Sequence, residues 1–159
     1  MTEDARFEDG AEAPLRLAAV DTGDVPVISA MLQDAVFHAT DIAWDRAARR
    51  FAILLNRFRW EDKPAADAAG RPYERVRTVL TIDDAVSVAS QGIDRADGGT
   101  VLSALSLDFE AGADGTGAFV VTLAGDGAVR IEVECVNATL TDVTQPYLAP
   151  SGKAPRHDV

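Results

Sequence analysis

The sequence predicts an α+β domain: mainly an antiparallel sheet of about 7–8 strands, curled or forming a partial barrel, with one early amphipathic helix. Two observations lead to this prediction. Apolar residues recur at the helical period in one segment near the N-terminus, and at a period of two through most of the chain that follows. Turn-forming residues separate the period-two segments at the spacing of hairpins. Because strands and helices do not alternate along the chain, we expect the helix to cover one apolar face of the sheet.

The early helix is predicted over residues 24–34. Four apolar residues share one helical face at i, i+3, i+4 and i+7: Ile28, Met31, Leu32 and Ala35. Thr22 or Asp24 can cap the first turn, and Pro26 stands where a missing N–H is tolerated. The period then changes to two, so we expect strands from there onward.

Alternation of apolar and polar residues predicts the strands. In the clearest case, between Val129 and Cys135, apolar residues alternate with arginine and glutamate. We expect one face of this strand to be buried and the other to contact water. After Cys135 the apolar residues change parity, which predicts a β-bulge at Cys135–Val136. Residues 61–73 contain two prolines and a glycine, and are predicted to form a loop.

The length of 159 residues is that of one domain. We expect an acidic, disordered tail over residues 1–13, a single α+β domain over 14–145, and an extended C-terminal tail over 146–159.

Composition excludes several classes of function. A net charge of −11 opposes nucleic-acid binding, because affinity for phosphate grows with the number of cations that a protein offers. The apolar runs are too short to span a membrane, and the acidic N-terminus is unlike a secretory signal. Cys135 is the single cysteine, which rules out an internal disulfide and a cysteine-based zinc site. We therefore expect a cytoplasmic protein, and the absence of phosphate-cradling glycine loops predicts no nucleotide cofactor.

The segment 49–61 gathers arginines and large aromatic side chains in an acidic protein. If its end is a strand, Arg57 and Arg59 project from one side. Arg75 and Arg77 do the same in a nearby strand. Should the two strands pair, four guanidinium groups would share one surface suited to carboxylate or phosphate. The candidate binding residues are Arg57, Arg59, Trp60, Arg75 and Arg77.

A plainer interpretation of the same residues stays open. The arginines can pair with the chain's own acids on a solvated sheet face, and Trp60 can pack at the rim of the core. His38 has acidic neighbours but no third ligand at a recognisable spacing, so no metal site is predicted. The parity of Cys135 places its thiol in the core, where it would be inert.

Several motifs resemble an alphaproteobacterial family of unknown function, of the DUF 2948 type. They are the arginine-aromatic block Arg57-Phe58-Arg59-Trp60-Glu61, the segment Gln91-Gly92-Ile93-Asp94, the strand Ile131–Cys135 and the C-terminal Pro155-Arg156-His157-Asp158. The resemblance extends over nearly the whole chain from Leu15. It implies a small cytoplasmic bacterial protein, and it supplies no activity, cofactor or catalytic residue.

Three functions remain as hypotheses. The first is a non-catalytic protein-binding module that uses the arginine-aromatic face or a free sheet edge. The second is a binder or regulator of an anionic small metabolite held beside Trp60. The third is an enzyme whose site gathers residues from distant parts of the sequence, with His38, an aspartate and an arginine converging in a pocket. A free sheet edge would also allow self-association into a homo-oligomer under any of these.

Overall fold

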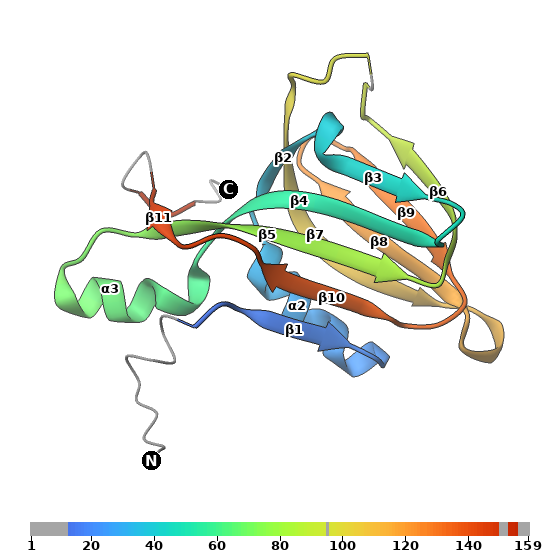
Figure 1. The fold of residues 1–159 in the computed structure, drawn as a ribbon, viewed down its shortest axis with the longest axis horizontal. Helices are drawn as coiled ribbons and strands as arrows, with labels where there is room; N and C mark the ends of the chain where they lie inside the picture. Colours follow the sequence, from blue (N-terminus) through green and yellow to red (C-terminus); the bar gives the residue numbers. More distant parts are fainter. Residues whose placement is uncertain (1–12, 95, 150–152, 156–159) are drawn as a thin grey trace.

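The computed structural model describes residues 13–94, 96–149 and 153–155. Within them, eleven strands form one antiparallel sheet accompanied by two α-helices (Figure 1). The strands are β1 (Arg16–Ala19), β2 (Val36–His38), β3 (Ile42–Asp45), β4 (Arg50–Phe58), β5 (Glu74–Asp83), β6 (Ala85–Gln91), β7 (Val101–Ala111), β8 (Gly117–Leu123), β9 (Ala128–Val133), β10 (Ala138–Asp142) and β11 (Tyr147–Leu148). The α-helices are α2 (Val25–Leu32) and α3 (Lys63–Ala69), and the short 3-10 turns are η1 (Thr22–Asp24), η2 (Ala39–Asp41), η3 (Trp60–Asp62) and η4 (Ala113–Gly115).

The strand order is β1-β10-β5-β4-β2-β7-β8-β9-β6, with β3 paired to β4 and β11 paired to β5. The sheet curls, so that β6 at one end returns beside the β3–β4 hairpin (Figure 1). There Ala85 N donates to Arg49 O at 3.0 Å. The antiparallel α+β prediction is therefore confirmed, but the strands outnumber the predicted 7–8, and the sheet does not close.

The core lies inside the curl. Odd-numbered residues of β4, such as Phe51 and Ile53, and even-numbered residues of β5, such as Leu80, point into it because the two strands are in register. α2 adds Ile28 and Leu32, which are fully buried. In Figure 1, α2 lies behind β10 and β1, so the side of these strands that faces the reader is the outer side of the sheet.

The early helix is present but shorter than predicted. A capping box forms at η1, where Gly23 N donates to the side chain of Asp21 and Asp21 N donates to Asp24. α2 follows directly, with proline in its first turn, and ends at Leu32. Gln33 then leaves the helical conformation with ψ of 130°, and Asp34 follows in a left-handed conformation with φ of 64°, so the chain turns away from the helix axis.

A second helix, α3, occupies the segment that the sequence analysis assigned to a loop. Pro64 stands in its first turn, and Gly70 ends it with φ of 67°. These are ordinary start and stop signals. The prediction of a single helix was wrong because α3 is short and has no large apolar residue to show a helical period; Ala66 is its buried residue.

The predicted β-bulge at Cys135–Val136 is a corner instead. β9 ends at Val133, and β10 begins at Ala138 on the other side of the β4–β5 pair. The corner is held by Glu134 N, which donates to Asp84 O at 3.0 Å, and by Asp83 N, which donates to Asn137 O at 2.9 Å. The change of parity thus marks a change of neighbours, because β10 inserts between β1 and β5.

The predicted tails lie mostly outside the described residues, which begin at Ala13 and leave out 150–152 and 156–159. Within the segment expected as a C-terminal tail, Tyr147 and Leu148 form β11 and pair with β5, so the ordered part extends past residue 145. None of the described helices has the length and apolar character needed to cross a membrane.

Candidate functional site

Arg57 lies on the face of β4 that points into the core, opposite Val76 of β5. Its side chain has no exposed surface. Glu61 accepts from Nη1 at 2.9 Å and from Nη2 at 2.8 Å, and Asp142 accepts from Nη2 at 3.0 Å. Thr78 Oγ1 accepts from Nε at 3.1 Å. Two carboxylates therefore neutralise this buried guanidinium, which joins β4, β5 and β10.

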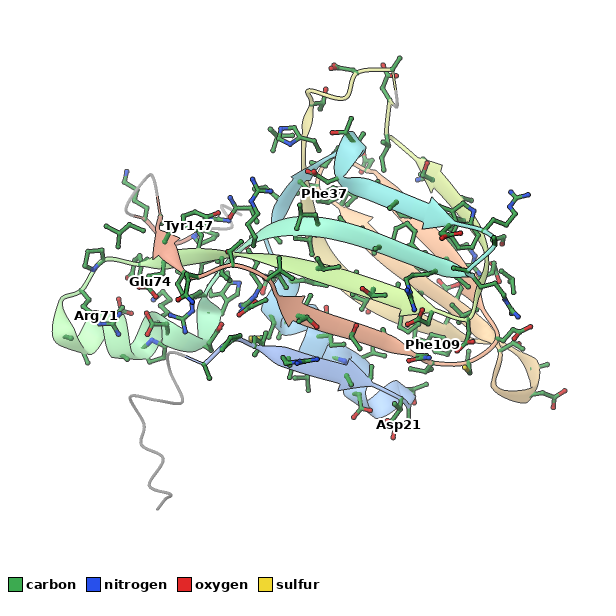
Figure 2. The ribbon with its side chains drawn as sticks, viewed as in Figure 1. Asp21, Phe37, Arg71, Glu74, Phe109 and Tyr147 are labelled. Atoms are coloured by element: carbon green, nitrogen blue, oxygen red, sulfur yellow. The ribbon has the colours of Figure 1, made fainter. Side chains whose placement is uncertain are left out.

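A second group of ion pairs continues the first toward α3. Arg59 is 4 % exposed and donates to Glu74. Arg71 donates to both oxygens of Asp62, at 2.9 and 3.0 Å. Figure 2 places Arg71 and Glu74 at the α3 end of the molecule. These pairs fasten α3 and the start of β5 to the end of β4.

Opposing effects set the pKa values in this network. Burial alone would raise the pKa of Glu61, but the hydrogen bonds and charge of Arg57 outweigh it and lower that pKa below its ordinary value. Burial likewise would lower the pKa of Arg57, and its two carboxylate partners raise it. The bonds from Arg71 lower the pKa of Asp62. All of these groups are therefore charged at neutral pH.

The predicted arginine face does not form as one surface. β4 and β5 do pair, but the register sets Arg57 opposite Val76 and Phe58 opposite Arg75. Residues that face one another in an antiparallel pair project to the same side. Arg57 is thus in the core, whereas Arg75 and Arg77 are on the outer side. The prediction failed because the sequence gives the parity within each strand but not the register between strands.

Trp60 packs against the aromatic residues at the end of β4. Its ring meets that of Phe58 edge to face, with centroids 4.7 Å apart, and the Tyr73 ring also meets Phe58 edge to face, with centroids 5.5 Å apart. The indole Nε1 donates to Gln33 O at 3.0 Å. Trp60 therefore has the packing role that was kept as its plainer interpretation.

A cavity of about 400 Å³ lies elsewhere, between β3 and β6. Apolar side chains form most of its wall, among them Ile42 and Trp44 of β3, Val88 of β6, and Ile93. The hydroxyl-bearing residues Thr40 and Ser90 also line it. None of its lining residues is titratable, so the cavity suits an apolar group with a few hydrogen bonds at the rim.

The strands beside this cavity each have one unpaired edge. β3 pairs with β4 and β6 pairs with β9, and the described strands supply no partner for the other edge of either. We call the gap between these two edges the seam. One end of the seam is closed by the bond from Ala85 N to Arg49 O and by the ion pair of Arg49 with Glu134 at 2.6 Å. The other end lies at η2, where Gly98 approaches Thr40.

Comparison with known proteins places the chain in a family. The family described as "Protein of unknown function (DUF2948)" matches residues 15–157. The chain belongs to this family. No curated protein and no solved structure matches it. Within this DUF2948 chain, the matched range covers the ion-pair network, the cavity and the seam.

In this DUF2948 protein His38 does lie beside an aspartate, but the pair is outside the cavity. His38 is exposed, and its Nδ1 lies 3.5 Å from Asp41 of the adjoining turn η2. Neither residue is among those that line the cavity. The part of the chain that the structure describes also holds no cluster of three histidine, cysteine or acidic residues able to bind a metal.

Cys135 is exposed, which corrects the prediction that its thiol is buried. It stands on the corner after β9 rather than within the strand, so its parity does not carry it into the core. Partial burial and a hydrogen bond to Asp84 raise the pKa of the thiol. A thiol with a raised pKa forms little thiolate at neutral pH, which makes it a poor nucleophile.

The seam is the feature that the sequence analysis did not find. The sequence does show that Ile42 and Trp44 lie on one face of a strand, and that Val88 and Ser90 lie on one face of another. Their proximity depends on how far the sheet curls, which no local pattern encodes. β3 and β2 are both short and share one edge of β4. A strand as short as β3 would have been the signal of an incomplete sheet.

Proposed function

We propose that this protein is a non-catalytic binding module that takes an extended segment of a partner protein along the seam between β3 and β6. The observation that carries the proposal is the pair of unpaired strand edges above an apolar cavity. It retains the free-edge form of the protein-binding hypothesis and does not use the face of four arginines, because Arg57 is buried in the core.

Strand addition supplies the affinity in this mode of recognition. An edge strand presents unpaired N–H and C=O groups, and an added segment satisfies them with main-chain hydrogen bonds. β3 spans four residues, so the segment that pairs along it is of similar length. An edge on each side would let the partner strand bond to both β3 and β6.

The cavity supplies the specificity. Side chains alternate along an extended segment, so every second residue of a bound strand points inward. Trp44 and Val88, from opposite sides of the seam, form apolar walls for such a side chain. Burying one large apolar side chain stabilises a complex by about 1.5–3 kcal/mol, before the costs of association.

Peptide selection tests this proposal directly. A library of random linear peptides is selected against the full chain, and the bound peptides are measured against two variants. Ser90→Trp fills the cavity, whereas Ala89→Trp places the same side chain on the neighbouring, exposed residue of β6, which does not line the cavity. We expect Ser90→Trp to weaken binding by about tenfold or more, equivalent to about 1.4 kcal/mol, and Ala89→Trp to leave it unchanged.

Hydrogen exchange locates the contact. Bound peptide should slow amide exchange in residues 42–45 and 86–90, because new ladder bonds protect these edges. If no peptide is enriched, or if the enriched peptides bind both variants equally and protect neither strand, the proposal is wrong.

A small apolar ligand is the second candidate occupant of the cavity. Its volume of about 400 Å³ falls within the range of small-molecule sites, and its uncharged wall favours an apolar compound over the anionic metabolite first considered. Such a compound would raise the melting temperature of the wild type and of Ala89→Trp, but not that of Ser90→Trp. A screen of small apolar compounds that moves none of the three melting temperatures would contradict this second function.

A further inference from the structure

A different part of the surface, on the outer side of β1, β10 and β5, carries arginines that form no ion pair with any described residue. We propose that Arg16, Arg75 and Arg77 form a docking surface for an acidic segment of a partner protein. This inference is independent of the seam, because it rests on other residues and on the opposite side of the β4–β5 pair.

Strand register places the three arginines on one side. Arg16 pairs with Thr141 of β10, and Thr141 pairs with Val79 of β5. Arg16 therefore projects with Val79, and so with Arg75 and Arg77, which share the parity of Val79. Arg75 and Arg77 are two residues apart on one strand, or about 6.5 Å. This is the side of the sheet that faces the reader in Figure 1.

Their lack of carboxylate partners sets them apart. Most arginines in the described residues form ion pairs: Arg49, Arg50, Arg57, Arg59, Arg71 and Arg130. Over the described ranges, Arg16, Arg75 and Arg77 form none; Arg46, in the β3–β4 turn, is the other such case. In a chain with 26 acidic residues and 15 basic ones, three arginines on one side of the sheet that form no ion pair among the described residues are a local reversal of charge.

Arg75 has the most restricted environment of the three. It stands between Phe58 of β4 and Tyr147 of β11, and its Nη1 donates to the backbone and side-chain oxygens of Asn56 at 3.1 and 3.2 Å. Burial lowers the pKa of this guanidinium. The negative charges of Tyr147 and Asp34 act in the opposite direction and raise the pKa, but by less. The group is thus held in place and partly stripped of water, which strengthens an added charge-assisted hydrogen bond.

Charge and shape favour an acidic protein segment as the occupant. Arg75 and Arg77 are spaced along β5 and Arg16 lies two strands away on β1, so the three guanidinium groups match carboxylates spaced along an extended chain that crosses the sheet face. Arg16 and Arg77 are exposed, so the face offers no enclosure that would retain a small anion by itself. The net charge of −11 repels nucleic acid over the rest of the surface.

Peptide titration tests the surface. The probe is a ten-residue peptide of alternating glutamate and serine, with a peptide of alternating glutamine and serine as the uncharged control. Binding to the full chain is followed by NMR at low salt. We expect the acidic peptide to shift the amides of β5 and β10, the control peptide to shift none, and added salt to weaken the binding.

Two matched variants separate a local surface from general attraction. Arg75→Gln combined with Arg77→Gln should weaken the acidic peptide at least tenfold, whereas Arg46→Gln, an exposed arginine without a carboxylate partner elsewhere, should not. Equal affinity for all three proteins would overturn the proposal, and so would a wild type that binds neither peptide. Displacement of the peptide by inorganic phosphate at equal concentration would also overturn it, since the surface would then be a phosphate site.

Discussion

Arg57 combines full burial with two carboxylate partners, which makes it the residue whose loss should harm the fold most. Its guanidinium meets Glu61 and Asp142, and the side chain of Asp142 is itself 4 % exposed. A buried ion pair is stable only while both partners are present, because a lone buried charge keeps its desolvation penalty.

Arg57→Met should therefore lower the free energy of unfolding by about 3–5 kcal/mol, since it leaves the Asp142 carboxylate buried without its cation. Urea denaturation measures the change, and Arg46→Met, at an exposed turn residue, is the control. Adding Asp142→Asn to Arg57→Met should recover part of the loss, because the buried charge is then gone. A loss in Arg57→Met no larger than in the control would contradict this role.

Cys135 should be modified slowly despite its exposure. The hydrogen bond and charge of Asp84 help to hold the pKa of the thiol above its ordinary value, so the reactive thiolate is scarce near neutral pH. Asp84→Asn removes that charge and should lower the pKa and speed alkylation by iodoacetamide. Asparagine also tolerates the positive φ of 59° at this residue. The alkylation rate is measured as a function of pH in both proteins. Equal rates at every pH would contradict the prediction.

At the scale of elements, α3 shows how a short helix is fixed by its ends and by ion pairs. The Asp62 carboxylate accepts a hydrogen bond from Arg71, and Lys63 donates to Asp67 at 2.9 Å within the helix. Gly70 ends the helix with φ of 67°, in open space where an added Cβ would meet no atom within 4 Å. A substitution there has a purely conformational cost.

Gly70→Ala should lower the free energy of unfolding by about 1–2 kcal/mol, the cost of a left-handed conformation for a residue with a Cβ. Gly99→Ala is the matched control, because Gly99 has no positive φ and its nearest atom to an added Cβ is 3.8 Å away. Thermal or urea unfolding distinguishes the two. Equal stability of both variants would mean that the end of α3 relaxes freely.

The elements also show the limit of sequence reasoning in this chain. The helix at Ile28 and Leu32 was predictable because its apolar residues repeat at a fixed period. The role of Arg57 was not, because its neighbours Glu61 and Asp142 come from a turn and from a strand 85 residues away. The alternation within β5 correctly placed Arg75 and Arg77 on the same side of the sheet. Only the register between β4 and β5 could show that Arg57 points to the opposite side.

At the scale of the molecule, the ion pairs of Arg57, Arg59 and Arg71 link strands from the middle and end of the chain, so their charge state should control acid stability. The folded pKa of Glu61 is below its ordinary value of 4.5, and that of Asp62 is below its ordinary value of 3.8. Unfolding would release both groups to ordinary values and let them bind protons.

The free energy of unfolding should therefore hold its full value above the ordinary carboxyl pKa and fall as the pH drops through the lower, folded values. Glu61→Gln removes one of these carboxyls, so its stability should be lower at neutral pH but should fall less steeply with acid. Denaturant unfolding between neutral pH and pH 3 measures both slopes, the lower limit being about one unit below ordinary carboxyl values. Parallel curves for the two proteins would contradict the assignment.

The pairing of β1 with β10 has a consequence for the order in which the protein completes its fold during synthesis. Arg16 pairs with Thr141, and Leu15 N donates to Asp142 at 2.8 Å, so the first strand among the described residues can pair only after β10 has been made. Until β10 leaves the ribosome, β1 has no neighbour in the sheet and Arg57 lacks one of its carboxylates. A nascent chain that stops before Ala138 therefore exposes an unpaired β5 edge and leaves Arg57 with Glu61 but without Asp142.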